Sequence, residues 1–253
     1  MGIRAAWVAF LSASICCAGA LAAEVVTVAA EDDWAPYSSA GPDPHSPQGL
    51  APKLVAAAFK TQDIQVRYVV LPFARCLHYA DKGTVVGCFD TSRTQANKDH
   101  YYWHPTPLFQ EEVGIFGRSD APAHEMSAKD LEGYTVGITV GYTYPASFMD
   151  NTRIVKLSAV SDSNLLKMLV ARRVDYILLN TQPGYYRLQH EPSLRGQIKR
   201  VGAIGVDSFW VSFSRTHPDG KRLCDTFEKG MQALKHSGDY DRMMADFRKT
   251  LKP

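Results

Sequence analysis

The sequence carries almost no excess of charge: its 253 residues include 28 basic and 26 acidic side chains, with no block of like charge. Proteins that bind nucleic acid or acidic lipid concentrate positive charge, so this balance argues against both ligand classes. Internal repeats and low-complexity segments are also missing. With 45% hydrophobic and 21% charged residues, the chain has a globular composition and suits one large domain or two modest ones.

Common catalytic and metal-binding motifs are lacking too: the sequence has no G-x-S-x-G, no H-E-x-x-H and no Cys/His protease signature. His100 and His104 stand four apart, which on a helix would place two imidazoles on one face. The intervening "YYW" and Pro105 instead favour extended structure. Cys224 lies in an apolar helical stripe that favours packing over nucleophilic chemistry. We therefore expect no metal, no cofactor and no enzymatic activity.

A long uncharged stretch follows the start of the chain. Arg4 precedes "AAWVAFLSASICCAGALA", which is too short and too rich in Ala and Ser for a comfortable membrane span. The stretch ends in small residues typical of a signal-peptidase site, and strand-like sequence begins soon after Glu24. We predict a signal peptide over residues 1–22 and a soluble periplasmic protein. An uncleaved anchor or an N-terminal core helix is the alternative, while Ile15 and Cys16 poorly fit the positions before a lipidated cysteine.

Cleavage at that point leaves three cysteines. Cys76 falls in the first turn of a predicted helix and Cys88 in the strand that follows it. In an oxidising compartment these two cysteines are candidates for a disulfide across a helix-on-strand contact, stabilising the fold by about 3 kcal/mol. The alternative is a pair of buried, reduced thiols.

Strands and helices alternate in the first part of the chain. The apolar patterns predict strands over 25–30, 64–71 and 85–89, with helices over about 50–59 and 73–82 between them. This βαβαβ order predicts a parallel sheet whose ligand crevice lies at the carboxyl ends of its strands. The run "TSRTQANKDHYYW" (91–103) follows the third strand and is a candidate ligand-binding loop, or else a solvated turn.

The alternation then begins again. We predict extended structure over 111–118, strands within 131–141, 174–179 and 209–215, and a helix from near Ser163. Two amphipathic helical stripes, 223–234 and 240–247, end the pattern. The order favours two α/β lobes joined by extended crossings.

Several segments, in order along the chain, resemble a known family. "EDDWAPYS", "QGLAPKLVAAAF", "GYTVGITVGYTY", "LLKMLVARRVDYILLN" and "ALKHSGDYDRMMADF" are similar to segments of type II periplasmic solute-binding proteins, the bacterial extracellular family 3 that serves polar amino-acid ABC transporters. The resemblance implies two lobes, each a mixed, mostly parallel sheet flanked by helices. Residues 23–117 plus 207–253 would form lobe 1 and residues 118–206 lobe 2, with a two-strand hinge and closure over a ligand. It also implies a monomer that docks on a membrane ABC permease or a sensor receptor.

The resemblance also places candidate ligand contacts. Trp34, with Tyr37 close behind, matches an aromatic after the first strand, and Ser92 lies in the hydroxyl-rich loop after the third. Thr143 matches a hydroxyl beside a helix N-terminus. Asn97 stands where amino-acid receptors carry the arginine that clamps the ligand carboxylate, and Asn180 where they carry the aspartate that pairs the ammonium. Neutral amides form weaker contacts than charged groups, so we predict a small polar ligand that is not a standard α-amino acid.

Other residues near the predicted strand ends are possible substitutes. Arg75 and Arg93 are candidates for anion binding; an ion pair of Arg75 with an acid such as Asp90, and an outward-facing Arg93, are the alternatives. Asp90 suits a cationic or hydroxylated ligand, or caps the next turn. Tyr142 is a candidate, with the other cleft aromatics, for the wall of a site that accepts a flat or cationic ligand.

An enzyme on the same scaffold is a second possibility. The family includes exported cyclohexadienyl dehydratases, and Glu31, Asp90 or His78 are candidates for the general acid of such a reaction. A carboxylated substrate would, however, need the arginine that Asn97 replaces. The sequence therefore favours a binding protein that delivers its ligand to an importer or reports it to a sensor.

Overall fold

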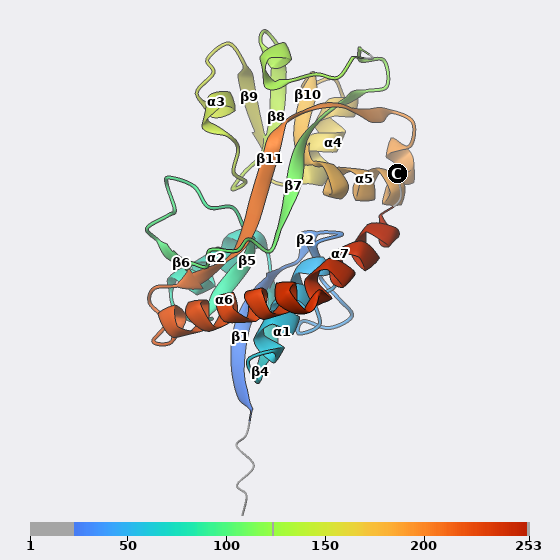
Figure 1. Ribbon diagram of the computed structural model, residues 1–253. Coiled ribbons are helices and arrows are strands. Elements are labelled where there is room, and N and C mark those ends of the chain that lie inside the picture. Colours follow the sequence, from blue (N-terminus) through green and yellow to red (C-terminus); the bar gives the residue numbers. More distant parts are fainter. Residues whose placement is uncertain (1–22, 123, 252–253) are drawn as a thin grey trace, which may run out of the picture.

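The computed structural model describes residues 23–122 and 124–251 (Figure 1). The predicted signal peptide, residues 1–22, lies outside the described residues. Within the described part of the chain, no helix combines the length and apolar character that crossing a membrane requires.

The first part of the chain builds a parallel sheet. Strand β1 (Glu24–Glu31) lies between β4 (Ile64–Leu71) and β5 (Gly87–Thr91) and is parallel to both. Helices α1 (Leu50–Lys60) and α2 (Phe73–Asp81) form the crossovers. The C-terminal helices α6 (Gly220–Ser237) and α7 (Asp239–Thr250) complete this part, where Gly230 lets α6 approach the backbone of α1. The remaining short strands are β2 (Asp33–Trp34), β3 (Ser38–Ser39) and β6 (Tyr101–Trp103).

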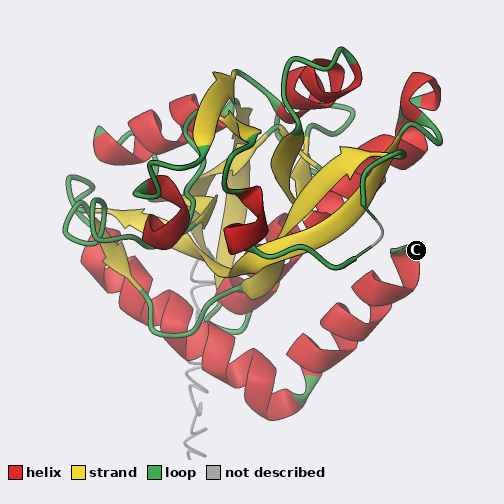
Figure 2. Cartoon of the chain, turned by 90° about the horizontal axis from the view of Figure 1, so that it is seen from above, coloured by secondary structure: helices red, strands yellow, loops and turns green. Residues whose placement is uncertain are grey.

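The second part builds its own sheet. Strand β8 (Thr135–Thr139) is parallel to both β9 (Val155–Ala159) and β10 (Tyr176–Asn180). Its helices are α3 (Ala146–Met149), α4 (Asp162–Val170) and α5 (Thr181–His190), with short 3₁₀ turns η1 (Ala128–Leu131) and η2 (Pro192–Leu194). Figure 2, seen from above, shows the helices arranged around the strands.

Two long antiparallel strands connect the parts. β7 (Phe109–Arg118) and β11 (Ile198–Ser214) pair from Phe109 with Phe209 to Arg118 with Ile198, and both run between the lower and upper parts in Figure 1. Strand pairing is therefore continuous, in the order β4-β1-β5-β11-β7-β10-β8-β9, with β6 on β11. The two-lobed α/β fold predicted from the sequence is confirmed.

The apolar core is divided rather than continuous. One large cluster surrounds Phe59, Phe213 and Phe227 in the first part, whereas separate clusters around Val136 and Leu165 fill the second. Val113 and Ile115 of β7 pack in the second part's core. Each part thus has its own apolar core, as separate domains do.

A disulfide joins Cys76 of α2 to Cys88 of β5, with the Cα atoms 5.6 Å apart. This confirms the bridge over the alternative of two reduced thiols. Cys224 is a buried free thiol of α6 within the first part's core, where its apolar stripe predicted it to pack.

Candidate functional site

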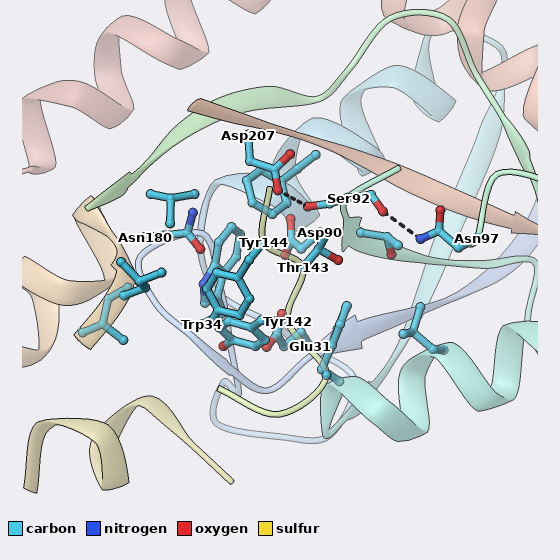
Figure 3. Close-up of a pocket in the computed structure, with 18 residues that line it drawn as sticks. Glu31, Trp34, Asp90, Ser92, Asn97, Tyr142, Thr143, Tyr144, Asn180 and Asp207 are labelled. Carbon is cyan, nitrogen blue, oxygen red and sulfur yellow. Dashed lines mark hydrogen bonds between the residues drawn. The ribbon is translucent and has the colours of Figure 1, made fainter. Parts of the chain in front are cut away.

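A cavity of about 90 Å³ lies between the two parts (Figure 3). Both parts and the connecting strands contribute to its lining, which consists of Glu31, Trp34, Phe73, Leu77, Asp90, Thr91, Ser92, Asn97, Val113, Gly141, Tyr142, Thr143, Tyr144, Leu178, Leu179, Asn180, Asp207 and Phe209. Seven of the ten predicted ligand contacts are in this set. Tyr37, Arg75 and Arg93 are not.

Trp34 forms an aromatic wall of the cavity and is held rigidly by other rings. Its ring centroid lies 4.9 Å from that of Tyr37 and 4.8 Å from that of Phe209. Tyr37 stacks on Phe109 behind the wall and donates a hydrogen bond from its hydroxyl to Glu111 of β7. Tyr37 therefore supports the site from behind instead of lining it.

Asp90 is the most unusual side chain of the cavity. It sits at the carboxyl end of β5, is only 4% exposed, and neither of its carboxyl oxygens has a hydrogen-bond partner. The predicted alternatives for this residue, a turn cap or an ion pair with Arg75, are both wrong. Its backbone has φ of 63°, a strained conformation for a residue other than glycine. Burial raises the pKa of this carboxyl well above its usual range.

Asn97 closes a turn in the loop after β5. Its side-chain oxygen accepts a hydrogen bond of 2.7 Å from the Thr94 amide, and its Nδ2 donates to the Ser92 carbonyl at 2.8 Å. The Ser92 hydroxyl in turn donates to the Asp207 carboxylate at 2.6 Å (Figure 3). The polar atoms of Asn97 are thus used to shape the loop, and this fixes Ser92 at the cavity wall.

The second part contributes the opposite wall. Tyr142 packs edge-on against Phe73 of α2, with ring centroids 6.3 Å apart, so the two parts touch here. The Tyr144 hydroxyl accepts a hydrogen bond from the Thr139 amide, and this holds its ring in place. Asn180 ends β10 and is 9% exposed, with an unpartnered Nδ2.

The resemblance places Thr143 beside a helix N-terminus, and α3 begins three residues later, at Ala146. This helix has only four residues. Four residues supply little of the positive potential that a full helix offers an anion at its N-terminus. The hydroxyl of Thr143 lines the cavity, and α3 adds little positive potential beside it.

The two candidate anion-binding arginines also lie elsewhere. Arg75 is exposed on α2 and Arg93 is exposed on the loop after β5. The lining set contains neither lysine nor arginine, but it does contain three carboxyl groups, on Glu31, Asp90 and Asp207. The described residues hold no group of three or more His, Cys, Asp or Glu side chains arranged to bind a metal ion.

Burial raises the pKa values of all three lining carboxyl groups, and neighbouring carboxylates add to the effect at Glu31. Burial first, and then the charges of Asp90 and Asp162, raise the pKa of Glu31 well above its usual range. Burial raises the pKa of Asp207 despite the hydrogen bond from Ser92. Burial also raises the pKa of Asp162, which lies behind the cavity on α4. The hydrogen bond from Thr139 and the charge of Arg187 partly offset this rise. The interior of the site is therefore strongly electronegative whenever these groups are ionised.

Arg187 of α5 links the two parts beside this cluster. Its guanidinium donates to the Asp33 carbonyl at 3.0 Å and forms an ion pair with the Asp33 carboxylate at the same distance. It also lies 3.9 Å from the Asp162 carboxylate and donates to the Ser163 hydroxyl. These contacts occupy Arg187 outside the cavity lining.

Sequence reasoning missed several lining residues. Asp207 and Phe209 lie on β11, which was predicted only over 209–215 because bulges interrupt its alternation near Gly202 and Gly205. Glu31 was considered only as a catalytic acid. Its position at the end of β1, on the same sheet edge as Asp90, was an available signal for a binding role.

Comparison with known families places the chain by its sequence. The model of the bacterial extracellular solute-binding proteins, family 3, matches residues 26–250, and the chain belongs to this family. A comparison with curated protein sequences finds no match.

Solved structures share the fold. A histidine kinase sensor domain with similarity to periplasmic binding proteins matches with a TM-score of 0.76 and 20% identity, over 90% of this chain and 98% of that one. An ancestral arginine-binding protein bound to arginine matches with a TM-score of 0.74 and 17% identity, over 88% and 97%. An amino-acid ABC transporter substrate-binding protein from Streptococcus pneumoniae, bound to L-arginine, matches with a TM-score of 0.72 and 19% identity, over 90% and 97%. At these identities the likeness shows the fold alone.

Proposed function

We propose that this protein is an exported solute-binding protein that captures a small polar molecule between two closing lobes. One observation carries the proposal: the cavity is lined from both parts of the chain and holds unpartnered buried polar groups from each, Asp90 from the first and Asn180 from the second. A buried polar group without a partner costs free energy, so a ligand that pairs with such a group and contacts both lobes favours the closed arrangement.

The family boundaries for the moving lobes are residues 23–117 plus 207–253 and residues 118–206, with β7 and β11 as the hinge. Val113 and Ile115 pack in the second part's core, so we place the bending point on β7 before Val113, and residues 113–117 move with the second lobe. Glu111, paired in register with Asp207, is the natural position. It accepts hydrogen bonds from Tyr37 in one lobe and from the Gln182 amide in the other, and so bridges the lobes at the hinge.

The ligand is not a standard α-amino acid. A free α-carboxylate needs a positive partner in a buried site, and no lysine or arginine is among the lining residues. Asn97, at the position of the family arginine, already uses both ends of its amide within its own loop. The proposed direct contacts with the ligand come from Trp34, Ser92, Tyr142, Thr143 and Asn180. Tyr37 holds the ring of Trp34 in place.

Delivery follows from the family. A signal peptide over residues 1–22 directs the chain to the periplasm, where the closed monomer docks on an ABC permease and releases its ligand for import. A sensor partner is the second candidate, because a histidine kinase sensor domain has the same fold. Loss of ligand uptake in a deletion strain would identify an importer, whereas loss of a transcriptional response with normal uptake would identify a sensor.

The same site argues against a dehydratase. A carboxylated ring substrate would face Glu31, Asp90 and Asp207 with no lining cation to bind its carboxylates. Incubation of the purified protein with prephenate or arogenate should give no aromatic product. Turnover would favour the enzyme and contradict a purely binding role.

The experiment that tests the proposal combines binding and shape. Thermal unfolding against a metabolite panel should identify a ligand, because a ligand that binds only the folded state raises stability by about 2.7 kcal/mol at 100 times its dissociation constant. Small-angle scattering should then show a smaller radius of gyration with that ligand. Trp34→Ala and Asn180→Ala, from opposite lobes, should both weaken binding, while Gln95→Ala on the exposed loop after β5 should not. Unchanged binding in both cleft variants would refute the assignment of the cleft.

A further inference from the structure

The charged side chains in the cavity lining are all acidic. Four lobe elements and one connecting strand direct carboxyl groups toward the cavity or hold them close behind it: Glu31 on β1, Asp33 on β2, Asp90 on β5, Asp162 on α4 and Asp207 on β11. Arg187 on α5 offsets part of this charge but is engaged by Asp33 and Asp162. Tyr142 and Tyr144 also face the cluster, and burial raises their pKa values, so both remain neutral hydroxyls. Within the lining itself, nothing balances Glu31, Asp90 and Asp207.

The burial of Asp90 distinguishes this site from an exposed acidic surface. Its carboxyl is 96% buried, and both oxygens are without a hydrogen-bond partner. Figure 3 places it among the lining residues, between the Ser92–Asp207 pair and Glu31. An ionised carboxylate only accepts hydrogen bonds, so the partner that satisfies two vacant oxygens is an N–H or O–H donor, and a positively charged donor forms the strongest bond.

The walls of the cavity fit the same ligand. Trp34, Tyr142, Tyr144 and Phe209 surround the acids with aromatic rings. The faces of aromatic rings attract cations, most strongly where water is excluded. Aromatic rings and carboxylates together bind ammonium and guanidinium groups. The ring faces and the carboxylates of the site both repel a carboxylate on a ligand.

We propose that the ligand of this site is a small organic cation with N–H donors, a primary amine or a guanidine without a carboxylate, whose charged nitrogen is bound by Asp90 with Glu31 and Asp207 nearby. This inference rests on the proposed function and narrows its ligand. The cavity of about 90 Å³ indicates a small ligand.

The test uses four-carbon probes that differ in charge. Calorimetry on the mature protein, after removal of bound ligand by unfolding and refolding, would compare putrescine, n-butylamine and agmatine with 1,4-butanediol and succinate. We expect the amines and agmatine to bind, and the neutral diol and the dianion not to bind. Tetramethylammonium carries a charge without any N–H or O–H donor and should bind at least about tenfold more weakly than the amines, because it leaves the Asp90 oxygens unpaired.

Asp90→Asn removes the charge and keeps the size of the side chain, and should weaken amine binding at least about tenfold. Asp99→Asn, an exposed residue of the loop after β5, is the matched control and should bind as the wild type does. Lowering the pH should weaken amine binding in the wild type, since the carboxyl groups must lose their protons to bind a cation. Asp207→Asn provides a second variant if Asp90→Asn fails to fold.

Each outcome decides a separate point. If succinate or the diol binds and compacts the protein while the amines do not, the solute-binding function holds and the cation inference fails. If the amines bind equally well to wild type, Asp90→Asn and Asp207→Asn, the inference also fails. If none of the cationic probes binds the wild type, this ligand class is wrong, and a metabolite panel that also gave no ligand would refute the binding function itself.

Discussion

Replacing Asp90 with asparagine should stabilise the protein in the absence of ligand. The carboxyl is 4% exposed, has no hydrogen-bond partner, and has a pKa raised by burial, so its charged form is costly in the folded state. Asparagine has nearly the same shape and accepts positive φ better than most residues, so the φ of 63° at this position is retained. The substitution therefore removes a buried charge without adding backbone strain.

The pH dependence has a defined sign. An aspartate in the unfolded chain has a pKa of about 3.9, whereas folded Asp90 has a raised pKa and keeps its proton to higher pH. Over that range the folded state binds more protons than the unfolded state, so the free energy of unfolding of the wild type falls as pH rises. The stability advantage of Asp90→Asn should therefore grow from near pH 4 toward neutral pH and level off above the folded pKa.

The amide of asparagine is also left without a partner, so the size of the effect is the cost of the charge alone, about 1.4 kcal/mol for each unit by which the pKa of folded Asp90 exceeds its unfolded value. For a chain of this size 1 kcal/mol corresponds to about 2–4 °C in Tm, so Asp90→Asn should raise Tm by about 2–10 °C at pH 7.5 and by little at pH 4. Thermal and urea unfolding of refolded, ligand-free protein would measure it. Asp99→Asn should show no such gain. A less stable Asp90→Asn at neutral pH, or a gain of equal size at pH 4, would refute the reasoning.

Three further predictions concern the framework of the site. Arg187→Ala removes the contact between α5 and β2. It should weaken ligand binding about fivefold in a titration and enlarge the radius of gyration of the ligand-bound form in scattering. The control Arg153→Ala, at an exposed residue, should change neither. Cys76→Ser with Cys88→Ser should cost about 3 kcal/mol by urea unfolding, and wild type in reductant should show the same loss. Gly230→Ala places a Cβ 2.2 Å from a backbone oxygen of α1 and should cost about 1–3 kcal/mol, measured as a lower Tm; an unchanged Tm would show that α6 shifts freely.

Asp90 shows how a binding site and fold stability oppose each other. The group that holds a cation most strongly is one whose charge is removed from water and left unpaired until the ligand arrives. Glu31 adds to the cost because Asp90 lies near it and raises its pKa. The arrangement described here bears this cost, and binding of the proposed cation would recover it. Stability gained by Asp90→Asn and affinity lost by the same change are therefore two consequences of one interaction.

Local patterns in the sequence were sufficient to predict most elements of the fold. Helix α1 follows from apolar residues at helical spacing between Leu50 and Phe59, and β4 was predicted with the bounds that the structure gives. Both predictions rest on the spacing of apolar residues within one segment, and residues adjacent in the sequence create that spacing. α5 and β9 were not predicted: α5 contains Pro183 and Gly184, which weaken a helical pattern, and β9 is an edge strand with mostly exposed residues.

The position of a candidate residue at a strand end was also visible in the sequence. Trp34 and Asn180 were selected through the family resemblance and Asp90 through its position at a predicted strand end, and all three line the cavity. The direction of a side chain was not visible. Arg75 and Arg93 come close to the same strand ends in the chain, but both point into solvent. One turn of helix or one step along a loop is enough to reverse the direction of a side chain. Only packing against the rest of the fold determines that direction.

The sequence by itself determined the α/β lobes and their order, and the family resemblance led us to expect Asn97 and Asn180 where relatives carry charged residues. Only the tertiary structure decided the charge of the site. Glu31, Asp90 and Asp207 are separated by long stretches of chain, and they meet because β1, β5 and β11 share one sheet and reach the same cavity. Burial, which gives their charges energetic weight, depends on both lobes closing around them, and no single segment of sequence encodes that enclosure.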